Sequence, residues 1–172
     1  MKDLLLLLVH LLTAAGRLLG HAKDALWSVD LFRCESIQLQ THWILVVIDQ
    51  FTRRIVGFAV QTGGVDGRAL CRMFNHAISR PGTPKYLSPD NDPLFLYHQW
   101  QANLRVLEID EIKTVPYTPT SPPFVERLIG TVRREFLDHT LFWNARDLGR
   151  KLADFQVYYH CHRTHSSLGG ET

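Results

Sequence analysis

The sequence lacks most of the features that would set it apart from ordinary globular proteins. It has 3 cysteines (Cys34, Cys71 and Cys161) and no CxxC pair. Scattered cysteines in odd number predict free thiols in a reducing compartment, and a 45% hydrophobic content fills a core without disulfide bonds. The formal net charge is only +2, so the total charge does not require a polyanionic partner. We find no internal repeat.

A long hydrophobic run is also missing, apart from a short one at the start of the chain. The apolar stretch from Leu4 to Leu12 is too short to cross a bilayer. With the small residues at 14–16 it has some character of a secretory signal, although Asp3 weakens the positive N-terminus that such signals need. We expect a leucine-rich leader helix over residues 1–22 that packs on another element, and one folded domain over residues 23–172. A secreted enzyme stays as an alternative.

Hydrophobic periodicity predicts an α/β fold. Three β-type segments on short connections predict an antiparallel meander, and later segments alternate between helix and strand. The expected product is a mixed five-stranded sheet, three antiparallel strands and then parallel ones, flanked by helices. The predicted strands are 26–36, 41–50, 54–61, 85–89 and 111–119, and the predicted helices are 68–79, 93–105, 124–139 and 145–163.

Three acidic residues occupy positions where metal-dependent chemistry could place them. Asp30 lies inside an apolar strand, Asp90 ends a strand and opens a loop, and Glu126 lies in the first turn of a helix. Each alone has an ordinary explanation, as a solvent-facing strand residue, a turn residue or a helix-dipole partner. Together they are the oxygen ligands that two divalent cations need for phosphodiester cleavage.

The strings around these acids resemble a known family. WSVDLF, YLSPDND and PFVERLIGTVRRE, with 35 residues (91–125) between Asp90 and Glu126, are similar to the three motifs of the integrase core of retroviral integrases and bacterial insertion-sequence transposases. The hairpin HWILVVIDQFTRRIVGF and the terminal YYHCHRTHSSLGG resemble further signatures of that family. The likeness covers about residues 26–170.

The resemblance implies a ribonuclease H-like fold and an integrase catalytic core over residues 23–172. It also implies DNA cleavage and strand transfer by transesterification, with Mg²⁺ or Mn²⁺ in a two-metal site held by Asp30, Asp90 and Glu126. The expected partners are the DNA element ends, target DNA and a second copy of the chain or more, with no membrane. The expected location is the bacterial cytoplasm, at the nucleoid.

The chain departs from the family pattern in two ways. The glycine that usually follows S-D-N is Asp92 here, which adds a fourth acid and a possible substitute ligand. With Asp92 the spacing to Glu126 would be 33 residues (93–125); we prefer Asp90 because it ends the strand. The family's usual N-terminal helix-turn-helix is not apparent, so we expect a core without a DNA-reading segment.

Basic residues near Glu126 and near the C-terminus are candidate DNA contacts. Such contacts would position the phosphate backbone without reading bases, although a solvated polar face is the alternative. A zinc site built from His160, Cys161 and neighbouring histidines is disfavoured because no Cys pair completes it. The expected DNA-binding residues are Arg127, Arg133, Arg134, His162, Arg163 and His165.

Two further acids and two rival functions stand beside this interpretation. Asp49 and Asp66 are expected to be structural, because they lie at a hairpin turn and in a break of glycines before a helix. One rival function is a ribonuclease H-like nuclease on the same fold. Another is a catalytically silent DNA-binding remnant whose acids never hold metal.

Overall fold

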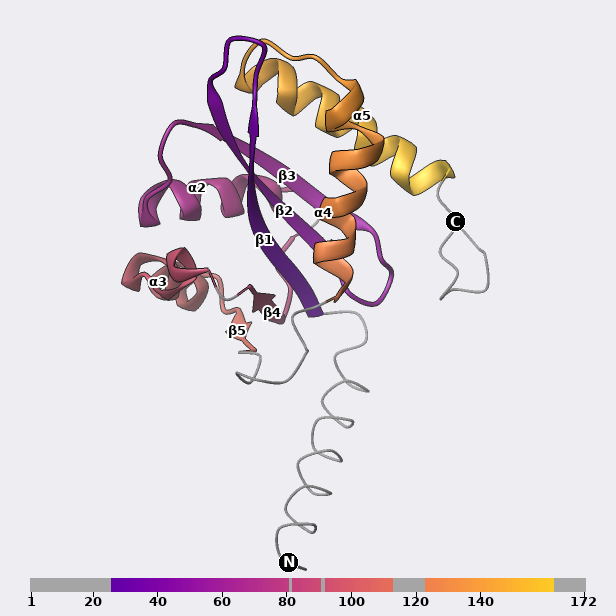
Figure 1. Ribbon diagram of the computed structural model, residues 1–172. Coiled ribbons are helices and arrows are strands. Elements are labelled where there is room, and N and C mark those ends of the chain that lie inside the picture. The colour runs from indigo at the N-terminus through magenta and orange to yellow at the C-terminus, as the bar shows by residue number, and fades with distance from the viewer. Residues whose placement is uncertain (1–25, 81, 91, 113–122, 163–172) are drawn as a thin grey trace, which may run out of the picture.

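The computed structural model describes residues 26–80, 82–90, 92–112 and 123–162. Five strands and four α-helices follow one another along this part of the chain, with two 3-10 turns (η1 and η2) between them (Figure 1). Their bounds are β1 Leu26–Glu35, β2 Thr41–Asp49, β3 Ile55–Thr62, α2 Gly67–Ala77, β4 Tyr86–Pro89, η1 Pro93–Leu96, α3 His98–Val106, β5 Asp110–Glu111, α4 Pro123–Glu135, η2 Leu137–His139 and α5 Ala145–His162.

The strands form one mixed sheet in the order β3-β2-β1-β4-β5. β1 pairs antiparallel with β2, and β2 antiparallel with β3, whereas β4 runs parallel to β1 and β5 parallel to β4. This confirms the predicted meander followed by parallel strands. β1 is central, and it pairs Asp30 with Val46 on one side and Val29 with Pro89 on the other.

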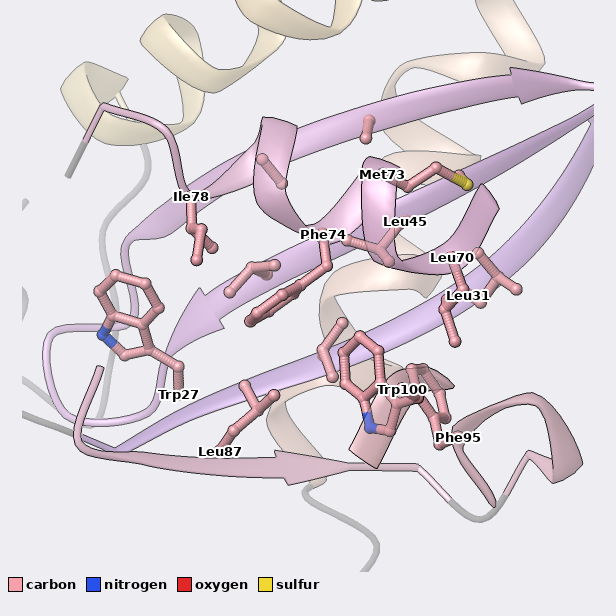
Figure 2. Close-up of a cluster of buried hydrophobic side chains, with 14 of the residues drawn as sticks. Trp27, Leu31, Leu45, Leu70, Met73, Phe74, Ile78, Leu87, Phe95 and Trp100 are labelled. Carbon is pink, nitrogen blue, oxygen red and sulfur yellow. The ribbon is translucent and has the colours of Figure 1, made fainter. Parts of the chain in front are cut away.

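Helices cover both faces of the sheet (Figure 1). On one face, α2, η1 and α3 enclose an apolar cluster in which the Phe74 and Phe95 rings meet Trp100 edge-on at 5.0 and 5.1 Å (Figure 2). On the other face, α4 and α5 pack on a second cluster with Phe32 of β1. One stripe of α5 is buried here, and it consists of Leu148, Leu152, Phe155 and Tyr159.

The helix predicted over residues 93–105 is wrong as a single element. Asp92 caps a 3-10 turn by accepting from the Leu94 backbone N–H at 2.8 Å, and Tyr97 then takes an extended conformation before α3 begins. In a continuous helix the two side chains would leave the axis in fixed directions. Because the helix is broken, Phe95 and Trp100 both reach the core. The strand predicted over 111–119 begins one residue earlier, at Asp110, and residues 113–119 lie outside the described part.

The leader over residues 1–22 and its boundary at residue 23 also lie outside the described residues. Within the residues that the structure describes, no helix is long and apolar enough to span a membrane.

Candidate active site

Asp30 is a buried carboxylate in the middle of the sheet. It is 7% exposed, and it shares its face of β1 with Ser28 and with Phe32, which packs in the cluster under α4 and α5. Its Oδ1 accepts a hydrogen bond from the Leu31 backbone N–H at 2.6 Å. Burial is the main cause that raises the Asp30 pKa from 3.8 to about 7.

Asp90 lies beside Asp30 on the neighbouring parallel strand. It directly follows β4, and its backbone N–H donates to the Val29 carbonyl at 3.3 Å. Since Ser28 pairs with Ser88 in this parallel ladder, continuing the register brings Asp90 next to Asp30 on the same face. Asp92 instead caps η1 with its Oδ1, a structural duty that Asp90 does not share.

Glu126 comes to the same place from a helix. It lies exposed in the first turn of α4, between Val125 and the outward Arg127. Val125 and Leu128 are 0% and 2% exposed and anchor this turn in the second cluster, together with Ile48 of β2. The buried stripe of α4 therefore fixes the helix on the sheet and leaves the Glu126 carboxylate at its border.

The four acids act on one another electrostatically. After burial, the charges of Asp90, Glu126 and Asp92, in that order, raise the Asp30 pKa further. Carboxylates crowded around a buried one are unfavourable unless a proton or a cation joins them. An all-oxygen set of this kind suits a hard divalent cation, so the residues present fit Mg²⁺ or Mn²⁺.

The side chains as they stand do not form a finished metal site. Within the described ranges, no three His, Cys, Asp or Glu groups converge closely enough to hold an ion. The carboxylates would have to turn toward one another to share a cation. The assignment of Asp30, Asp90 and Glu126 as ligands therefore stays a prediction, as does Asp92 as a substitute.

The arginines of α4 point to three different places. The Arg133 guanidinium lies 5.3 Å from the Phe32 ring, two residues along β1 from Asp30. Arg134 folds back over Gly130, where its Nη1 lies 3.0 Å from the position a β-carbon would take. The Arg127 charge acts on Arg53, in the turn between β2 and β3. All three stay predicted DNA contacts.

At the C-terminal end of α5, His162 is exposed and its ring lies 5.5 Å from that of Tyr158. Arg163 and His165 lie outside the described residues. His160, part of the disfavoured zinc cluster, accepts a hydrogen bond at Nε2 from the Ile55 backbone N–H at 3.0 Å. The His160 side chain therefore joins α5 to the edge of β3.

The two acids expected to be structural are confirmed as caps. Asp49 Oδ1 accepts from the backbone N–H groups of Phe51 and Thr52 at 2.8 and 2.9 Å. Asp66 Oδ1 accepts from the Ala69 N–H at 2.7 Å and caps α2. The first of these turns also contains Arg53, which was not among the predicted site residues although it lies in the hairpin HWILVVIDQFTRRIVGF that resembles a family signature.

Two models of the integrase core domain match the chain, one over residues 20–119 and the other over residues 107–172. The chain belongs to the integrase core domain family. Among its relatives is the insertion element IS476 uncharacterized 39.2 kDa protein of Xanthomonas euvesicatoria, 29% identical over 143 residues, which are 83% of this chain and 41% of that protein. The insertion element IS407 uncharacterized 31.7 kDa protein of Burkholderia multivorans is 26% identical over 86% of this chain and 53% of its own length. The chain thus spans about half or less of the relatives it matches.

Solved structures with the same fold include a retroviral integrase core and a transposase catalytic domain. The HTLV-2 integrase catalytic core domain in complex with magnesium has a TM-score of 0.63 at 19% identity, over 87% of this chain and 92% of that one. The Mos1 transposase catalytic domain, solved with raltegravir and Mg, has a TM-score of 0.62 at 15% identity, over 78% of this chain and 72% of that one. The fold of this integrase core is therefore ribonuclease H-like, as predicted.

Proposed function

We propose that the chain is the catalytic core of a metal-dependent DNA transposase that cleaves DNA and transfers the cut strand. The observation that carries the proposal is the buried Asp30, on which the charges of Asp90, Glu126 and Asp92 act within the sheet of an integrase core. Family membership supports DNA integration as the setting.

Asp30, Asp90 and Glu126 would hold the metal ions, and Asp92 would assist or substitute. When bound, divalent cations would supply Lewis-acid activation of the attacking and leaving oxygens. Asp30 is the rigid member of the set because β1 and its own burial hold it. Glu126 is the member that a helix supplies, and the buried stripe of α4 positions it at the border of the second cluster.

The two chemical steps are both displacements at phosphorus. In the first, a water oxygen bonds to phosphorus at the element end, and the bond to the 3′ oxygen breaks to release a 3′-hydroxyl. In the second, that hydroxyl oxygen bonds to a target phosphorus while a target 3′ oxygen leaves, so one phosphodiester replaces another. The protein's own contribution is positioning and charge stabilisation, without a covalent protein–DNA intermediate.

The substrates would be DNA element ends and target DNA. Since two ends must be joined, we expect a homodimer or a larger assembly to act. The basic residues Arg127, Arg133 and Arg134 of α4, with His162, Arg163 and His165, would hold the phosphate backbone near the metal ions, and binding would weaken as salt is raised.

The test is a joining assay on a labelled duplex with a pre-cut end, in Mg²⁺ or Mn²⁺. We expect a longer strand-transfer product that depends on metal and disappears in Glu126→Gln. Glu135→Gln, exposed at the other end of α4, is the matched control and should keep the activity. Cleavage without joining would favour a nuclease, and metal-independent DNA binding without any cleavage would favour a silent remnant.

A further inference from the structure

The turn between β2 and β3 holds Arg53 in an unusual backbone conformation. Arg53 has φ 61, the left-handed region that glycine and asparagine enter at low cost and that other residues enter at about 1–2 kcal/mol. The turn itself is tightly built on Asp49, whose carbonyl accepts the Arg53 N–H at 3.0 Å and whose own N–H donates to the Arg54 carbonyl at 3.0 Å. An arginine at this position suggests that its side chain has a function, because strained backbone conformations are found at functional sites.

The same turn is attached to the strand that carries Asp30. The Gln50 backbone N–H donates to the Leu26 carbonyl at 3.0 Å, and its side-chain amide donates to the Ser28 hydroxyl. Ser28 is 0% exposed and lies two residues before Asp30 on the same face of β1. The turn is therefore held at the end of the sheet where the acids gather.

The first turn of α4 shares a hydrophobic cluster with the strands on either side of the β2–β3 turn. Val125 belongs to the same cluster as Ile48 and Ile55, which flank this turn. Arg127, two residues after Val125, is close enough to act on Arg53 electrostatically. Burial and then the Arg127 charge lower the Arg53 pKa, whereas Tyr159 and then Asp49 raise it.

We propose that Arg53 and Arg127 together bind one backbone phosphate of the DNA strand beside the acid cluster. The inference rests on the proposed function, because only a DNA substrate brings such a phosphate there. Two guanidinium groups of like charge repel each other, and an anion between them turns that repulsion into two charge-assisted contacts. Arg127 follows Glu126 directly, so the bound phosphate lies close to the reacting one.

Such a site positions DNA without selecting its sequence, since phosphates carry no base identity. Phosphate binding would also explain why an arginine occupies this left-handed position, which the folding of the turn does not require. Asparagine at position 53 would keep the turn and remove the charge, which separates the two roles of this residue.

The experiment measures binding of the full 172-residue chain to a labelled pre-cut duplex, across a salt series, together with the Tm. Arg53→Asn is compared with Arg54→Asn, which removes the same charge from the exposed neighbouring side chain in the same turn. We expect Arg53→Asn to weaken binding roughly tenfold and to flatten the salt slope by about one phosphate contact. Its Tm should stay level or rise. Arg54→Asn should change DNA binding by no more than about twofold, because an exposed charge that binds no phosphate contributes little.

A double variant tests whether the two arginines share one phosphate. Arg53→Asn combined with Arg127→Gln should weaken binding by less than the product of the two single effects. Equal binding by the Arg53 and Arg54 variants while the wild type binds DNA would overturn this inference and leave the proposed function standing. A wild-type chain that binds no DNA in any salt would overturn both.

Discussion

The two faces of the sheet differ in what they bury. Under α2 and α3 the cluster is apolar throughout, with Leu70 and Phe74 0% exposed. Under α4 and α5 the sheet also buries polar side chains, and among them are Ser28, Asp30 and Ser88. β1 serves both faces, because alternate residues along one strand point to opposite sides.

The side chains of β1 therefore stabilise the fold on one face of the sheet and contribute to the candidate active site on the other. Val29 and Leu31 hold β1 on the apolar face, and β1 can then keep between them a buried Asp30 whose charged form is unfavourable. Natural sites commonly retain such destabilising groups because function requires them.

The largest effect should come from Asp30→Asn. We expect strand-transfer activity to fall at least about a thousandfold, roughly 4 kcal/mol in the activation barrier, because the rigid carboxylate of the set is lost. In the absence of metal the same variant should unfold at a higher temperature than wild type, since a buried charge is removed. Product formation on gels and calorimetric Tm measure the two effects, and a fall in both would contradict the division of the faces.

On the opposite face, Phe74→Ala should affect stability alone. Phe74 is 0% exposed and packs against Trp100 at 5.0 Å, so the cavity should lower the free energy of unfolding by about 3–5 kcal/mol. Urea unfolding gives this value. We expect the fraction that is still folded to retain metal-dependent joining, and a specific loss of activity there would contradict the separation.

The pH dependence of stability should sharpen the contrast. Because the Asp30 pKa is about 7 in the folded chain and 3.8 is its usual value, the folded state binds the extra proton between these limits. The contribution of Asp30 to the free energy of unfolding is therefore greatest below its usual pKa of 3.8. It falls as pH rises toward 7, by roughly 2–4 kcal/mol in total. Saturating Mg²⁺ should offset much of this fall, and Asp30→Asn should abolish it. Unfolding curves at a series of pH values measure this dependence. If the unfolding free energies of wild type and Asp30→Asn changed with pH in the same way, the expected effect of the buried Asp30 would be contradicted.

A smaller effect is expected where α2 crosses β3. A β-carbon at Gly57 would lie 2.2 Å from the Ala77 carbonyl oxygen, so Gly57→Ala should lower the unfolding free energy by about 1–3 kcal/mol. Gly149→Ala is the control, because nothing lies within 4 Å of its β-carbon and alanine favours a helix. We expect that variant to be as stable as wild type or slightly more so.

Much of the fold could be predicted from local sequence, because its periodicity agrees with the final packing. The three meander strands and the buried stripes of α4 and α5 follow directly from apolar spacing. The break at Tyr97 could not be predicted in this way. It depends on the Asp92 cap and on the core positions of Phe95 and Trp100, which local spacing does not encode.

The candidate site also has a part that the sequence predicts and a part that it does not. The motif resemblance and the spacing of Asp30, Asp90 and Glu126 singled out the acids, and their closeness follows from the parallel pairing of β1 with β4. The electrostatic interaction between Arg53 and Arg127 could not be predicted from the sequence. It arises from the packing of Val125 against the strands that flank a distant turn.

The most direct measurement is a calorimetric titration of the chain with Mn²⁺ near neutral pH. It compares wild type, Asp30→Asn and Asp154→Asn, the last removing an exposed carboxylate from α5. We predict saturable binding in wild type and in Asp154→Asn, and none in Asp30→Asn. Equal binding by all three proteins, or by none of them, would contradict a metal site on the α4 and α5 face of the sheet.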